Sequence, residues 1–185
     1  QRYFDVGVEY AKATPDDVLI SITATNRGSE QAVLHLLPTL WYRNTWIWGC
    51  IHEGCWIKPV IRLAQDGALQ AEHVTLGRFH LAADAASDGT GYEWLFTENV
   101  TNVERLYGVP NERPYVKDAF HQYVVHGHAA AVNPRNFGTK VAAHYRLVIP
   151  AGAEVQVRLR LFAEAETPQE LFGDGFRQTM AERIA

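Results

Sequence analysis

The sequence lacks a long apolar run, a signal-peptide pattern and any block of lysines and arginines. Without the first two features, no segment is expected to cross a bilayer or to direct secretion. Without a basic block, and with a net charge of -4, the chain has no electrostatic footprint for nucleic acid or an anionic membrane. We therefore expect neither nucleic acid nor a membrane as a partner.

Cysteine is also scarce. The two cysteines, Cys50 and Cys55, cannot make a disulfide framework, and they favour a reducing compartment, so the expected location is cytoplasmic. The sequence contains no Gly-x-Ser-x-Gly elbow, no glycine-rich phosphate loop and no strand–helix–strand alternation. These absences give no support for a serine nucleophile and exclude a doubly wound nucleotide-binding fold.

The residues that are present predict a mainly β protein. With 185 residues, 47% of them hydrophobic, the chain can bury a sizeable core in one domain. Apolar and polar residues alternate in short runs separated by turn signals, which is typical of an antiparallel β-sandwich. The expected strands cover 4–10, 18–25, 32–37, 56–63, 68–73, 78–82, 92–97, 139–149 and 154–162. In the first of these, Phe4, Val6, Val8 and Tyr10 are expected to face the core.

The C-terminal region predicts a helix. Thr167, Pro168 and Glu170 form a capping pattern, and Phe176, Met180 and Ile184 recur every four residues as an apolar stripe. The glycines at 173 and 175 are expected to interrupt or restart this helix. The chain begins without Met inside a strand pattern and stops inside the helical pattern, so we expect a segment of a longer protein.

Tryptophan is concentrated in one stretch, 36–59, which contains Trp41, Trp46, Trp48 and Trp56. An indole ring has a flat apolar face and a polar edge, which suits sugar rings and protein interfaces as well as a core. Because Arg43 and Asn44 lie between the tryptophans, we expect part of the cluster to be a surface rather than core.

A metal site is the less favoured reading of the same stretch. Cys50, His52 and Cys55 are zinc-ligand types, and further histidines are His121, His126 and His128. The spacings match no familiar finger or ribbon, and cysteine is commonly a buried core residue. We therefore expect no metal and no cofactor.

Four carboxylates in the irregular segments 99–107 and 114–127 or beside them raise the possibility of glycoside cleavage. They are Glu98, Glu104, Glu112 and Asp118. A glycosidase needs two carboxyl groups held roughly 5 to 9.5 Å apart, which a sequence does not reveal. Loop carboxylates are usually solvated surface groups, so we favour that interpretation of these four residues over a catalytic pair. The triplet at Asn99 fits the N-glycosylation pattern, without a secretory signal to support it.

Long blocks of the sequence resemble one family. They are RYFDVGVEYAKATPDDVLISITATNRG, LHLLPTLWYRNTWIWG, LFTENVTNVERLYG, YVKDAFHQYVVHG, AVNPRNFGTKVAAHYRLVIPAG and VQVRLRL. Together they resemble bacterial putative glucosidases of glycoside hydrolase family 63, relatives of mannosyl-oligosaccharide glucosidase. The resemblance implies a supersandwich-like β-sandwich domain over 1–166 and the start of a linker helix over 167–185. The stretch CIHEGC lies outside it.

In this family a C-terminal (α/α)6 barrel supplies the catalytic acid and base for cleavage of α-glucosidic bonds. Nothing in the sequence matches that barrel, so the resemblance implies a non-catalytic domain with the barrel of its parent chain as partner. An α-glucosidic oligosaccharide is a second possible partner. The residues expected to meet the barrel or the sugar are Trp41, Arg43, Asn44, Trp46, Trp48, Glu98, Asn99, Lys117 and Asp118.

Two alternatives stay open. The first is a free-standing carbohydrate-binding module in which Trp41, Trp46 and Trp48 stack on sugar rings. The second is a mutarotase-like sugar epimerase, because similar sandwiches occur among such enzymes. A fold alone does not decide between these functions.

Overall fold

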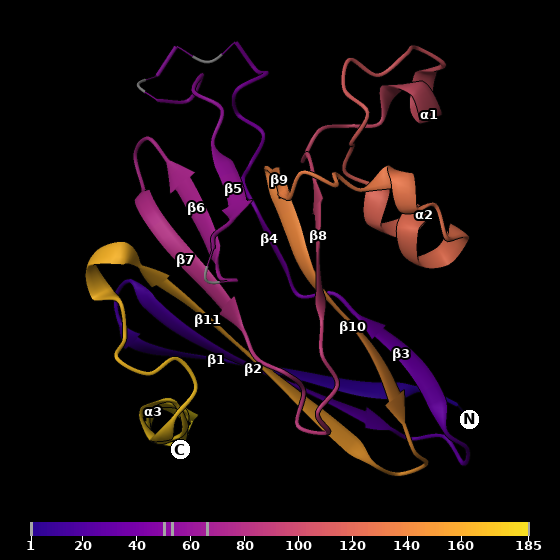
Figure 1. Ribbon diagram of the computed structural model, residues 1–185, viewed down its shortest axis with the longest axis vertical. Coiled ribbons are helices and arrows are strands. Elements are labelled where there is room, and N and C mark those ends of the chain that lie inside the picture. The colour runs from indigo at the N-terminus through magenta and orange to yellow at the C-terminus, as the bar shows by residue number, and fades with distance from the viewer. Residues whose placement is uncertain (1, 50, 53, 66, 185) are drawn as a thin grey trace.

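The structure, a computed structural model, describes residues 2–49, 51–52, 54–65 and 67–184. It confirms a mainly β fold: two antiparallel sheets pack face to face, with a helix at the C-terminal end (Figure 1). The larger sheet has seven strands in the order β1-β2-β11-β7-β6-β5-β9. Their bounds are β1 (Phe4–Thr14), β2 (Asp17–Asn26), β11 (Glu154–Ala163), β7 (Gly77–Ala83), β6 (Leu69–His73), β5 (Val60–Leu63) and β9 (Phe137–Gly138).

The smaller sheet is built around β10 (Lys140–Ile149). Along one edge of β10 lie β3 (Ala32–Leu36) and then β4 (Thr39–Trp41), and along the other edge lies β8 (Glu93–Thr97). The helices are α1 (Val103–Tyr107), α2 (Ala119–His126) and α3 (Asp174–Ile184), with 3-10 turns at Ala129–Ala131 and Glu164–Glu166.

The core lies between the inner faces of the two sheets. Alternate residues of β10 point into it and are fully buried, namely Val141, Ala143, Tyr145, Leu147 and Ile149. They pack against alternate residues of β2, β11, β6 and β5 in the larger sheet. This period of two is the one that the sequence shows in 139–149 and 154–162.

The expectation for the first strand is wrong in one respect. The side chains of Val6, Val8 and Tyr10 are 46%, 46% and 66% exposed, although they share the face that forms the core elsewhere in the sheet. The reason is topological, because β1 is the edge strand of the larger sheet and the four-stranded sheet does not extend over it. Alternation predicts which face a side chain takes, but not whether another layer covers it.

One strand is shorter than the sequence predicts, and two short strands were not predicted. The strand expected over 56–63 begins only at Val60, because Pro59 has no N–H to donate to a ladder. The short strands β4 and β9 were not predicted, since three and two residues are too few to show a period. β4 lies within the tryptophan stretch and contains Trp41, and β9 pairs with β5, the strand that follows the stretch.

The C-terminal helix begins later than its capping pattern predicts. Helix α3 starts at Asp174 rather than at Pro168. The start of the helix therefore coincides with the glycines at 173 and 175, where the sequence predicted an interruption or restart. The hydroxyl of Thr167 caps no helix, because it donates instead to the carbonyl of Glu164 at 2.8 Å.

A buried arginine explains the delayed start. The guanidinium of Arg160 donates to both oxygens of Asp17, at 2.9 and 2.6 Å, and both residues are buried. Its remaining donors reach the carbonyls of Glu170 and Leu171 at 2.9 and 3.1 Å. These bonds hold the segment at Glu170 and Leu171 against the sheet, just before the helix begins.

The apolar stripe of α3 packs on the larger sheet at β1 and β2. Phe176 and Met180 are buried against Ala11 of β1 and Leu19 of β2. The side chain of Ile184, the third member of the expected stripe, lies outside the described residues. Helix α3 therefore covers the outer face of β1 only around Ala11 and Ala13, and the outer-face residues Asp5, Gly7 and Glu9 are exposed.

Helix α2 packs on the outer face of the smaller sheet through a polar chain of side chains. Tyr123 donates to Glu93 at 3.0 Å, and the other oxygen of Glu93 lies 2.8 Å from Nδ1 of His144. Nε2 of the buried His144 lies 2.7 Å from Nδ1 of His35. When His144 donates to the carboxylate, its Nε2 accepts the proton of His35, which fixes the tautomers of both rings.

Removing Asp17 leaves the buried guanidinium of Arg160 without its anion. We expect Asp17→Ala to lower the free energy of unfolding by about 3–5 kcal/mol. The matched control is Asp5→Ala, which removes the exposed pair with Arg27 and is expected to cost no more than about 1 kcal/mol. Urea denaturation of both variants measures the difference, and equal losses would contradict the structural role of the buried pair.

Acidification is expected to weaken the His35–His144 contact. Burial, the neighbouring His144 and the charge of Arg146 lower the pKa of His35. The unfolded chain therefore takes up a proton at this residue more readily than the folded chain, so its contribution is complete above a pH of about 6.5 and is lost as the pH falls below that value. Urea denaturation of wild type and His35→Ala at several pH values tests this. The variant should lose less stability on acidification than wild type or the control His128→Ala, and parallel curves would refute it.

Candidate functional site

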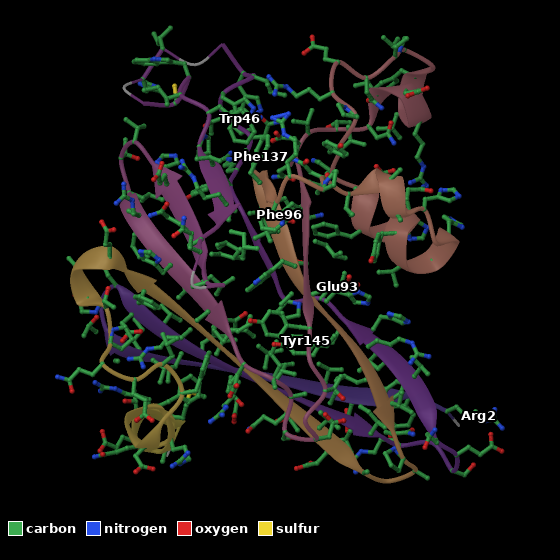
Figure 2. The ribbon with its side chains drawn as sticks, in the orientation of Figure 1. Arg2, Trp46, Glu93, Phe96, Phe137 and Tyr145 are labelled. Atoms are coloured by element: carbon green, nitrogen blue, oxygen red, sulfur yellow. The ribbon has the colours of Figure 1, made fainter. Side chains whose placement is uncertain are left out.

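The loops of one end of the sandwich form the candidate site. They are the segment 42–59 between β4 and β5, the segment 98–118 that contains α1, and the segment 133–136 before β9. Figure 1 shows the first two at the same end of the molecule, and Figure 2 places Trp46 and Phe137 there. We call this region the loop end.

The tryptophans expected to form a surface are at the loop end or, for Trp41, at the end of β4 next to it, and most are open to solvent. Trp41, Trp48 and Trp56 are 55%, 56% and 54% exposed, whereas Trp46 is half-buried. The guanidinium of Arg43 lies over the Trp48 ring, 4.7 Å from its centre, which restrains the indole at the surface.

A cavity of about 390 Å³ lies under the half-buried Trp46. Its lining joins the tryptophan segment to the α1 segment, so these two loops are neighbours. The lining residues are Trp46, Ile47, Lys58, Val100, Thr101, Val103, Val109, Pro110, Asn111, Glu112, Arg113 and Val116. Most of this lining is apolar, with the charged groups of Lys58, Glu112 and Arg113 among it.

Glu98 is the most deeply placed carboxylate of the loop end. It was expected in a polar loop, but it is only 5% exposed. Lys58 donates to one of its oxygens at 2.6 Å, and the hydroxyl of Thr139 donates to the other at 2.7 Å. The oxygen of that hydroxyl accepts the backbone N–H of Asn99 at 2.8 Å. The carboxylate thereby joins the end of the tryptophan segment, the end of β8 and the start of β10.

Asn99 adds a second link between these segments. Its side-chain amide donates to the carbonyl of Tyr42 at 2.9 Å, so the nitrogen that a glycan would occupy is used inside the fold. In the tryptophan segment, Asn44 has a buried side-chain oxygen with no hydrogen-bond partner among the described residues. A buried acceptor of this kind is costly unless a donor reaches it, which makes Asn44 the polar group of this end that most needs a partner.

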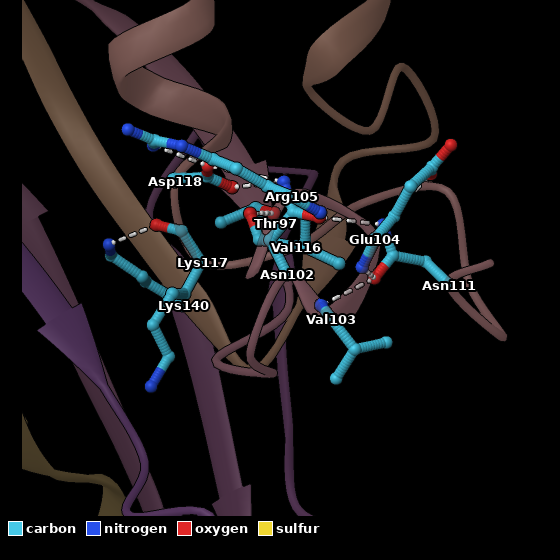
Figure 3. A network of polar contacts seen from close by, with 10 residues as sticks. All are labelled: Thr97, Asn102, Val103, Glu104, Arg105, Asn111, Val116, Lys117, Asp118 and Lys140. Carbon is cyan, nitrogen blue, oxygen red and sulfur yellow. Dashed lines mark hydrogen bonds and ion pairs between the residues drawn. The ribbon is translucent and has the colours of Figure 1, made fainter. Parts of the chain in front are cut away.

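Asp118 belongs to a separate network that holds the α1 segment (Figure 3). Arg105 donates to it at 3.0 Å, and the amide of Asn102 donates at 3.1 and 3.2 Å. Burial alone would raise the pKa of Asp118, but the hydrogen bonds from Arg105 and Asn102 and the charge of Arg105 outweigh it, so this pKa is lowered. Asn111 extends the network by accepting the backbone N–H of Val103 at 2.9 Å.

Lys117 contributes its backbone rather than its amine to this network. Its carbonyl accepts a hydrogen bond from the side chain of Lys140 at 2.8 Å, as Figure 3 shows. Burial and the charge of Lys117 lower the pKa of Lys140, whose amine also lies 4.8 Å from the centre of the Phe120 ring. The side chain of Lys117 itself is exposed.

These environments do not suit the two carboxyl groups that glycoside cleavage requires. The general acid of a glycosidase needs a raised pKa, and that of Asp118 is lowered. Both oxygens of Glu98 are occupied by Lys58 and Thr139. The remaining candidates, Glu104 and Glu112, are exposed.

The described part of the chain gives no support for a metal site. No group of three or more histidine, cysteine, aspartate or glutamate side chains there is placed to hold a metal ion. Cys50 lies outside the described residues, and Cys55 is not a free thiol. His121, His126 and His128 contact one another through their rings along α2 and its end.

Three residues of the loop end were missed by the sequence prediction. Lys58 and Thr139 are the partners of Glu98, and Arg135 lines a second cavity of about 290 Å³ beside it. Their only sequence signal is position, since Lys58 precedes Pro59, just before β5, and Thr139 precedes β10. Within the described residues, no helix is long and apolar enough to cross a membrane.

Comparison with known proteins gives one informative similarity. No family model matches the sequence. The chain is similar to a Saccharomyces cerevisiae protein described as uncharacterized protein YMR196W, with 33% identity over 181 residues. The similarity covers 85% of this chain but 16% of the yeast protein, so the chain spans about one sixth of that relative's length.

Proposed function

We propose that this chain is a non-catalytic β-sandwich domain of a glucosidase-like glycoside hydrolase. Its loop end packs against the (α/α)6 catalytic barrel of the parent polypeptide, which cleaves α-glucosidic bonds. The family resemblance of the sequence blocks supports the class of enzyme. The span of one sixth of the yeast relative supports a domain role within a larger protein.

One observation supports the docking role most strongly. Large apolar side chains lie together at the loop end and are exposed there. They are Trp41, Ile47, Trp48, Ile51, Trp56, Ile57, Leu106, Tyr107 and Val109. Such groups on one end of a domain usually mark a surface that another protein or domain covers. The two loops that carry them share the cavity under Trp46, so they form one surface rather than two.

The polar groups of the loop end fit the same role. Interfaces are enriched in tryptophan and arginine, and Arg43 over Trp48 presents both as one unit. The unpartnered oxygen of Asn44 would gain a hydrogen bond from a donor on the barrel. Glu98 and Asp118 then stabilise the loops and take no part in bond cleavage.

A sugar-binding module is the second candidate, favoured by the exposed indole faces of Trp41 and Trp48. An indole that stacks on a sugar ring needs the same exposure as one that packs on a barrel. The two functions therefore differ in what the surface binds and not in its geometry.

Truncation of Trp48 tests the docking proposal. We expect Trp48→Ala to weaken association with the separately produced barrel domain by about 2 kcal/mol, close to thirtyfold, because central interface tryptophans have costs of this size. Its melting temperature should change by less than about 2 °C, since the side chain is exposed. Titration calorimetry and differential scanning calorimetry give the two values.

The matched control is Trp94→Ala. Trp94 packs against the core and donates its ring N–H to the carbonyl of Gly67 at 3.2 Å. We expect this variant to lower the melting temperature and to leave association unchanged. If Trp48→Ala instead behaves like Trp94→Ala, then Trp48 is a structural residue and the docking surface is wrong.

Incubating the isolated chain with α-linked disaccharides and an aryl α-glucoside separates the alternatives. We expect no glucose release and weak binding at most. Tight sugar binding that is lost in Trp46→Ala would establish the binding module. Turnover that survives repurification and is lost in Glu98→Gln or Asp118→Asn would make the chain an enzyme.

A further inference from the structure

A second apolar surface lies away from the loop end, on the inner face of β1. In the antiparallel register, Val8 is opposite Ile22 of β2, and Ile22 is opposite Val157 of β11. Directly opposed residues share a face, and both Ile22 and Val157 are buried in the core. The row of Val6, Val8 and Tyr10 is therefore the last row of the core face, and it is about half exposed.

An open groove runs beside this row. It has a volume of about 280 Å³ and lies between β1 of the larger sheet and the bend Leu36–Leu40 of the smaller sheet. Its other walls are apolar residues of β2 and β11. The sandwich is thus closed along its middle and open along the β1 side.

The backbone of β1 is also unsatisfied along that side. The carbonyl of Tyr3 accepts the N–H of Arg27, its register neighbour on the β2 side, at 3.0 Å. In an antiparallel ladder alternate residues bond to the same neighbour. The odd-numbered residues of β1 therefore bond to β2, and Val6, Val8 and Tyr10 direct their N–H and C=O groups to the free edge.

A long edge strand is normally protected by proline, a bulge or inward-pointing charge. β1 has eleven residues and no proline, and the one charged residue in the row of Val6, Val8 and Tyr10 is Lys12, near the end of the strand, whose amine donates to the carbonyl of Pro15 at 2.9 Å. Its register with β2 is regular until the irregularity at Lys12/Thr14. The opposite edge of the same sheet is β9, which has only two residues. β1 is therefore the one described edge of this sheet that is long enough to accept another strand.

Charge and the regular length of β1 together favour one register for pairing a second β1 with this edge. In such a dimer the two β1 strands run antiparallel and are related by a two-fold axis. If the inner faces of both strands lie on the same side of the joined sheet, this axis must pass beside a single residue, which then pairs with itself in the second copy. Centring on Gly7 places Asp5 opposite Glu9 of the second copy, and centring on Glu9 places two glutamates together. Centring on Val8 opposes no like charges, because Asp5 meets Ala11 and Glu9 meets Gly7. Centring on Val6 or Tyr10 also avoids like charges, but the first pairs only the start of β1 and the second brings the irregularity at Lys12/Thr14 into the paired region.

From this geometry we propose that the chain forms a two-fold symmetric dimer through antiparallel pairing of β1 with β1 of a second copy, centred on Val8. The larger sheets of the two copies become one continuous sheet, with Val6 opposite Tyr10 of the second copy. The two-fold axis uses both free edges at once, so the assembly closes at two copies. This surface shares no residue with the loop end, and the proposal does not depend on the proposed function.

Charge exchange at the two-fold axis tests the pairing directly. Val8→Lys places two ammonium groups opposite each other, and Val8→Glu places two carboxylates there. We expect wild type to dimerise with rising concentration in sedimentation equilibrium, and each variant alone to have a dimer dissociation constant at least about tenfold higher. An equimolar mixture of the two variants should recover dimers, since the opposed charges then attract. Val33→Lys, at another exposed valine in a strand, is the control and should dimerise like wild type.

Amide hydrogen exchange supplies a second readout. In the wild-type chain, the amides of Val6, Val8 and Tyr10 should become protected as concentration rises, while those of their odd-numbered neighbours stay protected throughout. A wild-type chain that remains monomeric at millimolar concentration would overturn the proposal. So would a dimer that both Val8 variants leave intact, a mixture that fails to recover dimers, or protection of the three amides that does not depend on concentration.

Discussion

The loop end depends on one buried carboxylate. Glu98 is held by Lys58 from the tryptophan segment and by Thr139 at the start of β10, so it joins three parts of the chain that are far apart in sequence. A carboxylate that is almost fully removed from water is stable only when its oxygens are paired. The charge of Glu98 therefore imposes a fixed arrangement on the loops that carry its partners.

Fixed loops explain how so much apolar surface is displayed at this end. Flexible loops that carry Ile47, Trp48 and Trp56 would lose conformational entropy on binding any partner. Here the Glu98 contacts, the bond from Asn99 to Tyr42 and the network around Asp118 order the segments in advance. The surface is thus ordered before any partner binds, as the proposed docking role requires, and the same contacts make Glu98 and Asp118 unsuitable as a catalytic pair.

Sequence patterns predicted the elements that depend on local alternation and failed where distant residues decide. The runs 139–149 and 154–162 are strands as expected, because each has a complete period of two. Alternation also gave the correct face of the sheet for Val8. Whether its side chain is buried depends instead on the second sheet, which does not extend over β1. Likewise, the start of α3 depends on Arg160, and the burial of Glu98 on Lys58. The tryptophan clustering revealed the loop end, whereas Lys58 and Thr139 have no motif.

Amide hydrogen exchange of wild type and Glu98→Gln tests the central claim, that Glu98 holds the loop end in place. The substitution keeps the shape of the side chain and removes the charge that binds Lys58. The account predicts faster exchange within 42–58 and 98–118, with unchanged exchange in the core strands β2, β10 and β11. Unchanged exchange in those loops, or an equal increase across the whole sandwich, would contradict it.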